Sequence, residues 1–304
     1  MPSTRDIRRR IKSVKNTAQI TKAMQMVASS KMRKAQLAAL AGRPYAVLMN
    51  QMIVSASKDS HDFVHPLMEK REIRKRGVLA ISTDKGLCGA LNSNLGREVM
   101  KFDKDHTVFI AAGKKAAQFF SRTKRNMAAE FLYKDAPLYA EARVIAKTLL
   151  EMFLKGEVDC VDIVYTRFVN TLTQKVEVRR LLPIGELQVL LNAPAREAEP
   201  APTGETAPLD AQTGADGTPL EHLFEPSAQA VLSDLLPHFV KFIVFQALLE
   251  AKASEHSARM VAMKNATDNA KQLIKDLTLE YNKLRQANIT KELLEITTAQ
   301  MALG

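Results

Sequence analysis

The chain has 304 residues, of which 46% are hydrophobic and 25% are charged, and its formal net charge at pH 7 is +11. This length allows one or two domains with a sizeable core, and the apolar fraction excludes a chain that is disordered throughout. The two cysteines, Cys88 and Cys160, lack the spacing of a metal site or a disulfide framework, so a reduced, intracellular protein is expected. No run approaches the roughly 18 apolar residues of a membrane-spanning helix, and the basic amino terminus lacks the apolar stretch of a secretory signal.

Positive charge is concentrated in residues 1–58, which contain 12 Lys or Arg residues and one acid, Asp6. This segment alone carries a net charge of +11, equal to that of the whole chain. Such a segment favours an acidic protein surface, a nucleic acid or an anionic lipid as its partner, although a solvated helix face would have the same composition. Its single aromatic residue, Tyr45, provides no stacking platform for nucleic-acid bases.

Residues 1–58 are expected to form a long amino-terminal helix. Ser3 and Asp6 match a capping box, and the helix formers Ala, Lys, Arg, Gln and Met dominate the rest of the segment. Gly42 and Pro44 interrupt the pattern, so we expect a bend or short break near Arg43–Pro44. An apolar stripe is interpreted as the contact face of this helix, consisting of Ile7, Ile11, Val14, Ala18, Met24, Val27, Leu37, Leu40, Leu48 and Met52.

Residues 59–192 are expected to form an α/β domain. Short apolar runs bounded by turn residues alternate with amphipathic stretches, which favours a mainly parallel, Rossmann-like sheet covered by helices. The expected strands are 77–82, 107–112, 160–167 and 174–182, the last two as a candidate hairpin. The expected helices are 91–102, the stretch from Gly113 to about Arg122, and 138–155.

Residues 193–225 are interpreted as an acidic linker that is rich in Pro, Gly, Ala and Thr and has a net charge of −6. Because this segment has almost no bulky apolar residues, it cannot offset the entropy lost on ordering. It is therefore expected to be disordered or to run over the surface as an extended excursion.

Residues 226–304 are expected to form a second long helix, with Pro237 kinking its first turns. A near-heptad seam is expected along it, formed by Ala266, Ala270, Leu273, Leu277, Tyr281 and Leu284. Helices of roughly 80 and 110 Å exceed the size of any small core, so each needs a partner along its length. The predicted fold is therefore a long antiparallel coiled coil of the two terminal helices, with the Rossmann-like α/β domain inserted between them.

Several kinds of chemical site are not expected. The turns at Gly86–Gly89 and Gly113–Lys114 match neither phosphate-binding glycine motif, His61 and His65 lack a third metal ligand, and no histidine lies near Cys88 in the sequence. We therefore expect no catalytic residue, cofactor, metal or small-molecule substrate. A basic coiled-coil protein that binds nucleic acid remains the alternative function.

Four stretches carry a resemblance to a known family. They are 7–34 (IRRRIKSVKNTAQITKAMQMVASSKMRK), 82–92 (STDKGLCGALN), 253–269 (ASEHSARMVAMKNATDN) and 281–296 (YNKLRQANITKELLEI). In this order they closely resemble the F-type ATP synthase gamma subunit of bacterial type, and the resemblance covers nearly all of the chain outside the linker. The absence of a long presequence before Ile7 is taken to favour the bacterial type.

The resemblance implies a non-catalytic rotor that couples rotation of a membrane c ring, driven by protons or sodium ions, to conformational cycling of the alpha and beta subunits. It implies alpha, beta, epsilon and the c ring as partners, no nucleic acid, and a peripheral location at the cytoplasmic face of the bacterial plasma membrane. Positions matching shaft–ring contacts of the family are Lys22, Met24, Arg259, Gln286, Thr290 and Glu292.

Further candidates for the shaft–ring surface come from charge and side-chain flexibility. Basic side chains able to face acidic ring loops are Arg8, Arg9, Lys12, Lys31, Arg33 and Lys34, although a solvated face is an equal alternative for part of this set. Met24, Met26 and Met32 provide adaptable apolar contacts, or else fill the coiled-coil seam.

Overall fold

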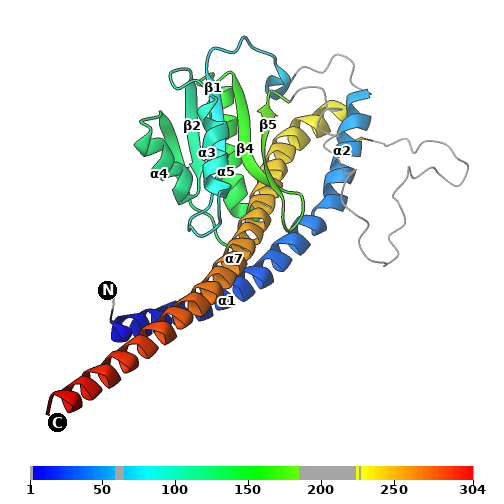
Figure 1. The fold of residues 1–304 in the computed structure, drawn as a ribbon. Helices are drawn as coiled ribbons and strands as arrows, with labels where there is room; N and C mark the ends of the chain where they lie inside the picture. Colours follow the sequence, from blue (N-terminus) through cyan, green and yellow to red (C-terminus); the bar gives the residue numbers. More distant parts are fainter. Residues whose placement is uncertain (1–2, 59–64, 185–223, 226, 304) are drawn as a thin grey trace, which may run out of the picture.

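A computed structural model describes residues 3–58, 65–184, 224–225 and 227–303. Two long helices lie side by side and form a rod, and an α/β domain packs against one part of that rod (Figure 1). Both termini lie toward the end of the rod that extends beyond the domain. The predicted fold class is confirmed. The predicted linker 193–225 lies outside the described residues except for Phe224 and Glu225.

Helix α1 (Thr4–Ala41) begins and ends where the sequence pattern predicts. The Ser3 side chain accepts a hydrogen bond from the Asp6 backbone N–H at 3.3 Å, and the Asp6 carboxylate in turn accepts one from the Ser3 backbone, which completes the capping box. The helix stops at Gly42, and α2 (Arg43–Lys58) continues the chain. The predicted break is therefore confirmed, because Pro44 lies in the first turn of α2, where its missing N–H costs no helical bond.

The other half of the rod is α7 (Ala228–Leu303), which runs antiparallel to α1. The Thr21 and Thr267 hydroxyl oxygens lie 2.8 Å apart and fix the register of the pair. Seam positions on α1 are Ile7, Ile11, Val14, Ala18, Thr21, Gln25, Ala28, Met32 and Ala35. Seam positions on α7 are Met263, Thr267, Ala270, Ile274, Leu277, Tyr281 and Leu284. Both sets repeat with steps of four and three, which is the heptad rule.

Two details of the predicted seam are wrong. Leu273 is 39% exposed, and its neighbour Ile274 takes the seam position, just as Thr267 takes the position expected for the half-buried Ala266, because the heptad steps by four residues from Met263 and again from Ala270. On the amino-terminal helices, five predicted contact residues face outward instead, namely Val27, Leu37, Leu40, Leu48 and Met52. The small side chains Ala28 and Ala35 occupy the seam there, so the two backbones can approach closely.

Helix α7 is continuous through Pro237, so the proline does not break it into two segments. One 18-residue window of this helix is apolar enough, by length and composition, to cross a membrane, which corrects the expectation that no such segment exists. Half of that window is buried inside the protein. Val240, Val244 and Leu248 are fully buried against the sheet, as expected of a core helix.

The domain contains a five-stranded sheet of order β3-β2-β1-β4-β5. Its parallel strands are β1 (Arg76–Ile81), β2 (Thr107–Ala112), β3 (Met127–Phe131) and β4 (Cys160–Phe168), and β5 (Gln174–Leu182) pairs antiparallel with β4. The hairpin of the last two strands is confirmed. Strand β3 was missed because it is a short, largely exposed edge strand without the apolar run that marks the others.

Helices cover both faces of the sheet. On one face, α3 (Leu91–Met100) and α4 (Lys114–Arg122) bury Phe120 against Phe109, with ring centroids 4.9 Å apart. On the other, α5 (Tyr139–Leu154), α2, the short 3-10 helix η1 (Pro66–Met68) and the first half of α7 form the larger core. The first half of α7 is therefore a layer of the α/β domain as well as part of the rod.

Candidate functional site

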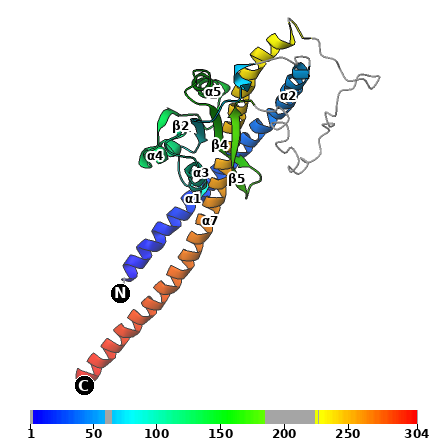
Figure 2. The same cartoon turned by 90° about the horizontal axis from the view of Figure 1, so that it is seen from above.

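The far end of α7 extends beyond the helix that pairs with it (Figure 2). Because Thr21 faces Thr267 and both helices rise equally, the first residue of α1 lies opposite about residue 284. Every residue from 285 to 301 is exposed, including the large apolar side chains Ile289, Leu293, Leu294, Ile296 and Met301. Leu293 is 58% exposed and Met301 is 84% exposed. Such a grouping of exposed apolar side chains marks a surface that another molecule covers.

Three of the sequence-predicted site residues lie on this protruding segment. Gln286, Thr290 and Glu292 are all exposed. The Thr290 hydroxyl donates to the Gln286 carbonyl at 2.9 Å, so these two residues lie one turn apart on the same side of the helix. We call residues 285–301 the shaft tip.

Six predicted basic residues lie on the exposed surface of α1. They are Arg8, Arg9, Lys12, Lys22, Arg33 and Lys34, and none of them forms an ion pair with a residue in the described ranges. Met26 is also exposed, Met24 is half-buried, and Met32 is buried in the seam. The seam alternative therefore holds for Met32, whereas Met26 is free to contact a partner.

Two other predicted residues already have partners inside this chain. Lys31 on α1 forms an ion pair with Asp135 of the α/β domain. Arg259 is only 11% exposed, with its Nη2 atom 2.7 Å from a Glu255 carboxylate oxygen and 3.3 Å from the Gly86 carbonyl. The structure thus places both residues where the rod meets the α/β domain, with Arg259 largely enclosed and Lys31 still exposed.

A buried lysine with three acidic neighbours occupies this junction. The Lys252 side chain is 1% exposed, and its Nζ atom lies 3.0 Å from Glu255, 3.7 Å from Asp135 and 3.9 Å from Asp84. It also lies 4.5 Å from the centroid of the Tyr133 ring. Sequence reasoning missed Lys252, although the sequence contained one signal. Glu250 and Lys252 interrupt the otherwise apolar run 247–253 of α7.

The electrostatics of the junction follow from burial and close partners. The hydrogen bond from Lys31 lowers the pKa of Asp135, and burial opposes that shift. Burial raises the pKa of Tyr133 well above its usual value, so the phenol stays protonated and donates to the Ser82 carbonyl at 2.9 Å. Burial lowers the pKa of His256 to about 4, which keeps this imidazole neutral at pH 7.

The turns that follow β1 and β2 approach each other closely at Gly113. Gly113 has a φ of 104°, and a Cβ atom there would lie 2.4 Å from the Ser82 carbonyl oxygen, so only glycine fits. Both cysteines are buried. His65 caps η1 through its Nδ1 atom, and no group of three metal-ligating side chains occurs within the described part of the chain; His61 lies outside it.

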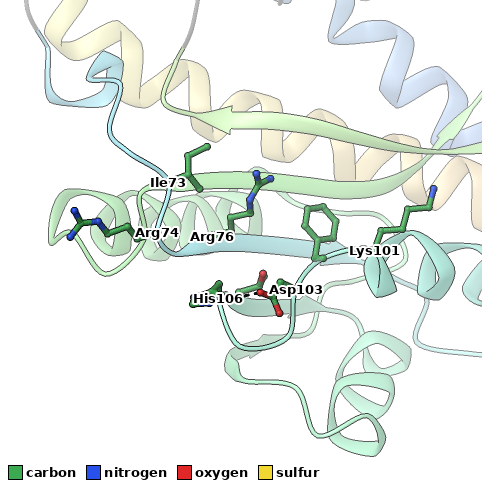
Figure 3. A pocket seen from close by; sticks show the side chains of 8 residues that line it. Ile73, Arg74, Arg76, Lys101, Asp103 and His106 are labelled. Atoms are coloured by element: carbon green, nitrogen blue, oxygen red, sulfur yellow. Dashed lines mark ion pairs between the residues drawn. The ribbon is translucent and has the colours of Figure 1, made fainter.

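A shallow basic hollow lies at the amino-terminal ends of β1 and β2, away from the turns that follow these strands (Figure 3). Its lining residues are Ile73, Arg74, Arg76, Lys101, Phe102, Asp103, His106 and Thr107. An acid outside the lining pairs with Arg76, whose Nη1 atom lies 3.4 Å from Asp162, and His106 lies 4.0 Å from Asp103. This side-chain set contains no paired nucleophile and base, so the hollow does not have the composition of a catalytic site.

Solved structures of two ATP synthases contain chains with the same fold. The chain shares its fold with a chain from the central stalk and c ring of the Tetrahymena thermophila mitochondrial ATP synthase, at a TM-score of 0.59 and 24% identity, covering 81% of this chain and 99% of that one. It matches a chain in the Euglena gracilis mitochondrial ATP synthase structure of OSCP, F1 and c ring at a TM-score of 0.65 and 23% identity, covering 99% and 94%. The fold is that of a central-stalk chain.

Sequence relatives identify the family. The ATP synthase family model matches residues 3–303. The ATP synthase gamma chain of Methylacidiphilum infernorum is 47% identical, with both chains fully covered, and that of Opitutus terrae is 49% identical over 99% of each chain. The chain belongs to the ATP synthase gamma-chain family and is a rotor subunit of a membrane-associated ATP synthase, not a catalytic chain. These relatives give no support to the nucleic-acid alternative.

Proposed function

We propose that the rod turns inside a ring of alpha and beta subunits and that the shaft tip is the part which the ring encloses. The observation that carries this proposal is the uncovered segment 285–301, in which five large apolar side chains face solvent at one end of a stiff helix. A helix that is apolar on an unpaired surface needs a partner to bury it. Alpha, beta, epsilon and the membrane c ring are the proposed partners, at the cytoplasmic face of the membrane.

The shape of the chain supports a mechanical role. Two paired helices resist bending more than one, and the domain packs against only part of their length, so the rotor is asymmetric about its long axis (Figures 1 and 2). As the c ring turns the domain end, the asymmetric rod presents a different face to each catalytic site in turn. ATP chemistry takes place in the ring, and this chain transmits the motion.

Electrostatic attraction supplies the second part of the proposed interface. Arg8, Arg9, Lys12, Lys22 and Arg33 are available to face acidic loops of the ring. Exposed charges attract a partner over about one Debye length, roughly 8 Å at physiological salt, without fixing one geometry. Contacts of this kind suit a shaft that must release each position as it turns. Met26 and the shaft tip provide the apolar part of the same surface.

Reconstitution tests the proposal directly. Purified alpha and beta subunits are mixed with this chain, and ATP hydrolysis is compared with that of alpha and beta alone. The proposal requires a complex with one copy of this chain per three alpha–beta pairs and a large rise in turnover. Failure to form a complex at any salt concentration would overturn it.

A charge-neutral variant tests the basic surface. Replacing Arg8, Arg9 and Lys12 with Gln is expected to slow assembly and to reduce its dependence on salt. The matched control replaces three exposed basic residues of the α/β domain, Lys104, Lys114 and Arg122, with Gln. Equal assembly rates and equal salt dependence for the two triple variants would mean that assembly depends on the total charge of the chain and not on the α1 surface.

A further inference from the structure

We infer that Lys252 is a positioning residue which locks the α/β domain to the shaft, so that torque passes between them without slip. The inference rests on the rotor role and adds a site within the chain where that torque crosses. Lys252 lies about a third of the way along α7, at the end of the stretch that packs in the domain core. It is among the largest side chains that are fully buried, and it is the charged member of that group.

The acids around Lys252 come from different elements. Asp84 lies in the turn after β1, Asp135 follows β3, and Glu255 is one turn farther along α7. Asp135 also pairs with Lys31 of α1, so one carboxylate joins both helices of the rod to the domain. Arg259 extends the network from Glu255 to the carbonyl of Gly86.

Two hydroxyl groups of α7 bind the other side of the domain. Ser254 donates to the Thr166 carbonyl on β4 at 2.9 Å, and Ser257 donates to the Thr171 carbonyl in the β4–β5 hairpin at 2.7 Å. The polar contacts of residues 252–259 therefore reach the loops after β1 and β3 as well as strand β4 and its hairpin. This short stretch of α7 is held from several directions at once.

The position of this network in the sheet is informative. In open α/β sheets, ligands bind outside the carboxyl ends of the parallel strands, where neighbouring strands connect in opposite directions. Here that point lies between β1 and β4, and α7 covers it with Lys252, Glu255 and their partners. The domain holds its own shaft at the place where related folds hold a small molecule.

Charge makes this contact resistant to twisting. Apolar side chains can slide past one another with little directional preference, whereas a buried ammonium group cannot leave its three carboxylates without losing the charges that stabilise it in the protein interior. A rotation of the shaft relative to the domain would have to draw the buried Lys252 ammonium group away from Asp84 and Asp135, which belong to the domain. We therefore assign the network to torsional stiffness and the surrounding core to overall stability.

The test uses the assembled holoenzyme in vesicles and measures ion pumping and ATP hydrolysis on the same sample. Lys252→Met removes the charge while keeping the length of the side chain. Lys271→Met is the matched control, because Lys271 is an exposed lysine of the same helix that pairs with Asp268 at 3.6 Å. Lys252→Arg keeps the positive charge and tests whether that charge is enough to preserve coupling. Asp135→Asn tests the half-exposed partner, where the fold tolerates the change more easily.

Torsional slip lowers the ratio of ions pumped to ATP hydrolysed. We expect Lys252→Met to reduce that ratio about threefold or more, because it removes the cation that Asp84, Asp135 and Glu255 share. Asp135→Asn should reduce it less, Lys252→Arg should restore at least half of the loss, and Lys271→Met should leave it unchanged. A merely structural role would lower pumping and hydrolysis together and would leave the ratio as it is.

Each other outcome decides the matter as well. An assembled Lys252→Met complex with the wild-type ratio would overturn the inference, as would equal losses for Lys252→Met and Lys271→Met. If Lys252→Met does not assemble, Asp135→Asn decides: a lowered ratio supports the lock, and an unchanged ratio overturns it. The rotor role would fail separately if ATP hydrolysis by the wild-type complex did not depend on the presence of this chain.

Discussion

The two ends of α7 differ in what covers them. From Leu236 to Ser257 most side chains are buried by the sheet, α5 and α1, and a buried lysine is surrounded by acids of this chain. From residue 285 to 301 every side chain faces solvent, although the segment still contains leucines, isoleucines and a methionine. The same helix is thus buried by its own chain toward one end and exposed to solvent at the other. The difference shows which part of the rod is suited to a partner.

The largest expected effects come from equal truncations at the two ends. Leu248→Ala removes a fully buried side chain and should lower the free energy of unfolding of the purified chain by about 2–5 kcal/mol. Leu293→Ala removes an exposed one and should change it by no more than about 0.5 kcal/mol. Urea denaturation of the two variants checks both values. Similar losses at the two positions would show that the tip is already covered within the chain.

The same pair should behave in the opposite way in the complex. Leu293→Ala is expected to weaken the rise in ATP hydrolysis that this chain gives to alpha and beta subunits, because it removes apolar surface that the ring buries. A folded Leu248→Ala chain should retain most of that rise. Steady-state ATPase measured against the concentration of each variant separates the two effects.

The seam between the ends gives a smaller effect. Ala28 is buried between α1 and α7, so Ala28→Leu inserts bulk where the backbones approach closely and should cost about 1–3 kcal/mol. Ala38 lies on the exposed side of α1, and Ala38→Leu should have almost no effect on unfolding. Thermal unfolding of both variants provides the comparison. An unchanged midpoint for Ala28→Leu would contradict close packing at this level.

The junction should respond to pH through His256. Its pKa is lowered to about 4 by burial, while the unfolded imidazole titrates near 6.5, so the unfolded state binds more protons between these values. The stability that the neutral His256 contributes to the folded chain is fully present above pH 6.5 and is lost as the pH falls toward 4. The groups that face the imidazole are Glu255, Arg259, Asp135 and Lys252. His256→Gln should flatten the dependence of the urea midpoint on pH across this window.

The smallest expected effect is at the start of α1. Ser3→Ala removes the cap that the Asp6 backbone N–H binds, and should speed hydrogen exchange in the first turn without changing the seam. The hydrogen bond from Ser3 also lowers the pKa of Asp6, so the cap is present above the ordinary carboxyl pKa and is lost as the pH falls through the lowered value. Exchange rates in residues 4–8 at pH 7 and in acid check this sign.

The sequence predicted most of the fold because its strongest signals are periodic. The capping box, the break at Gly42, four of the five strands and the antiparallel pairing of the terminal helices are all present. Strand β3 escaped because an exposed edge strand needs no apolar run. Val27 and Leu37 were assigned to the seam because they are apolar, yet both are exposed, and an apolar side chain on a helix need not be buried.

The site was harder to predict than the fold. Exposure of Arg8, Gln286 and Glu292 follows from helix periodicity, so their surface position could be predicted. The burial of Arg259 and Lys252 could not be predicted, because folding of the sheet is what brings Asp84 and Asp135 to α7. Contacts between residues more than a hundred positions apart leave no local pattern in a single sequence.

The most direct test of the rotor role asks whether the ring covers the shaft tip. Both native cysteines are buried, so a cysteine introduced as Leu293→Cys can be labelled selectively with a maleimide. Leu172→Cys, on the exposed β4–β5 hairpin, serves as the control. We predict that assembly with alpha and beta subunits slows labelling at position 293 strongly and changes it little at position 172. Equal labelling rates at position 293 before and after assembly would contradict the proposal that this segment turns inside the ring.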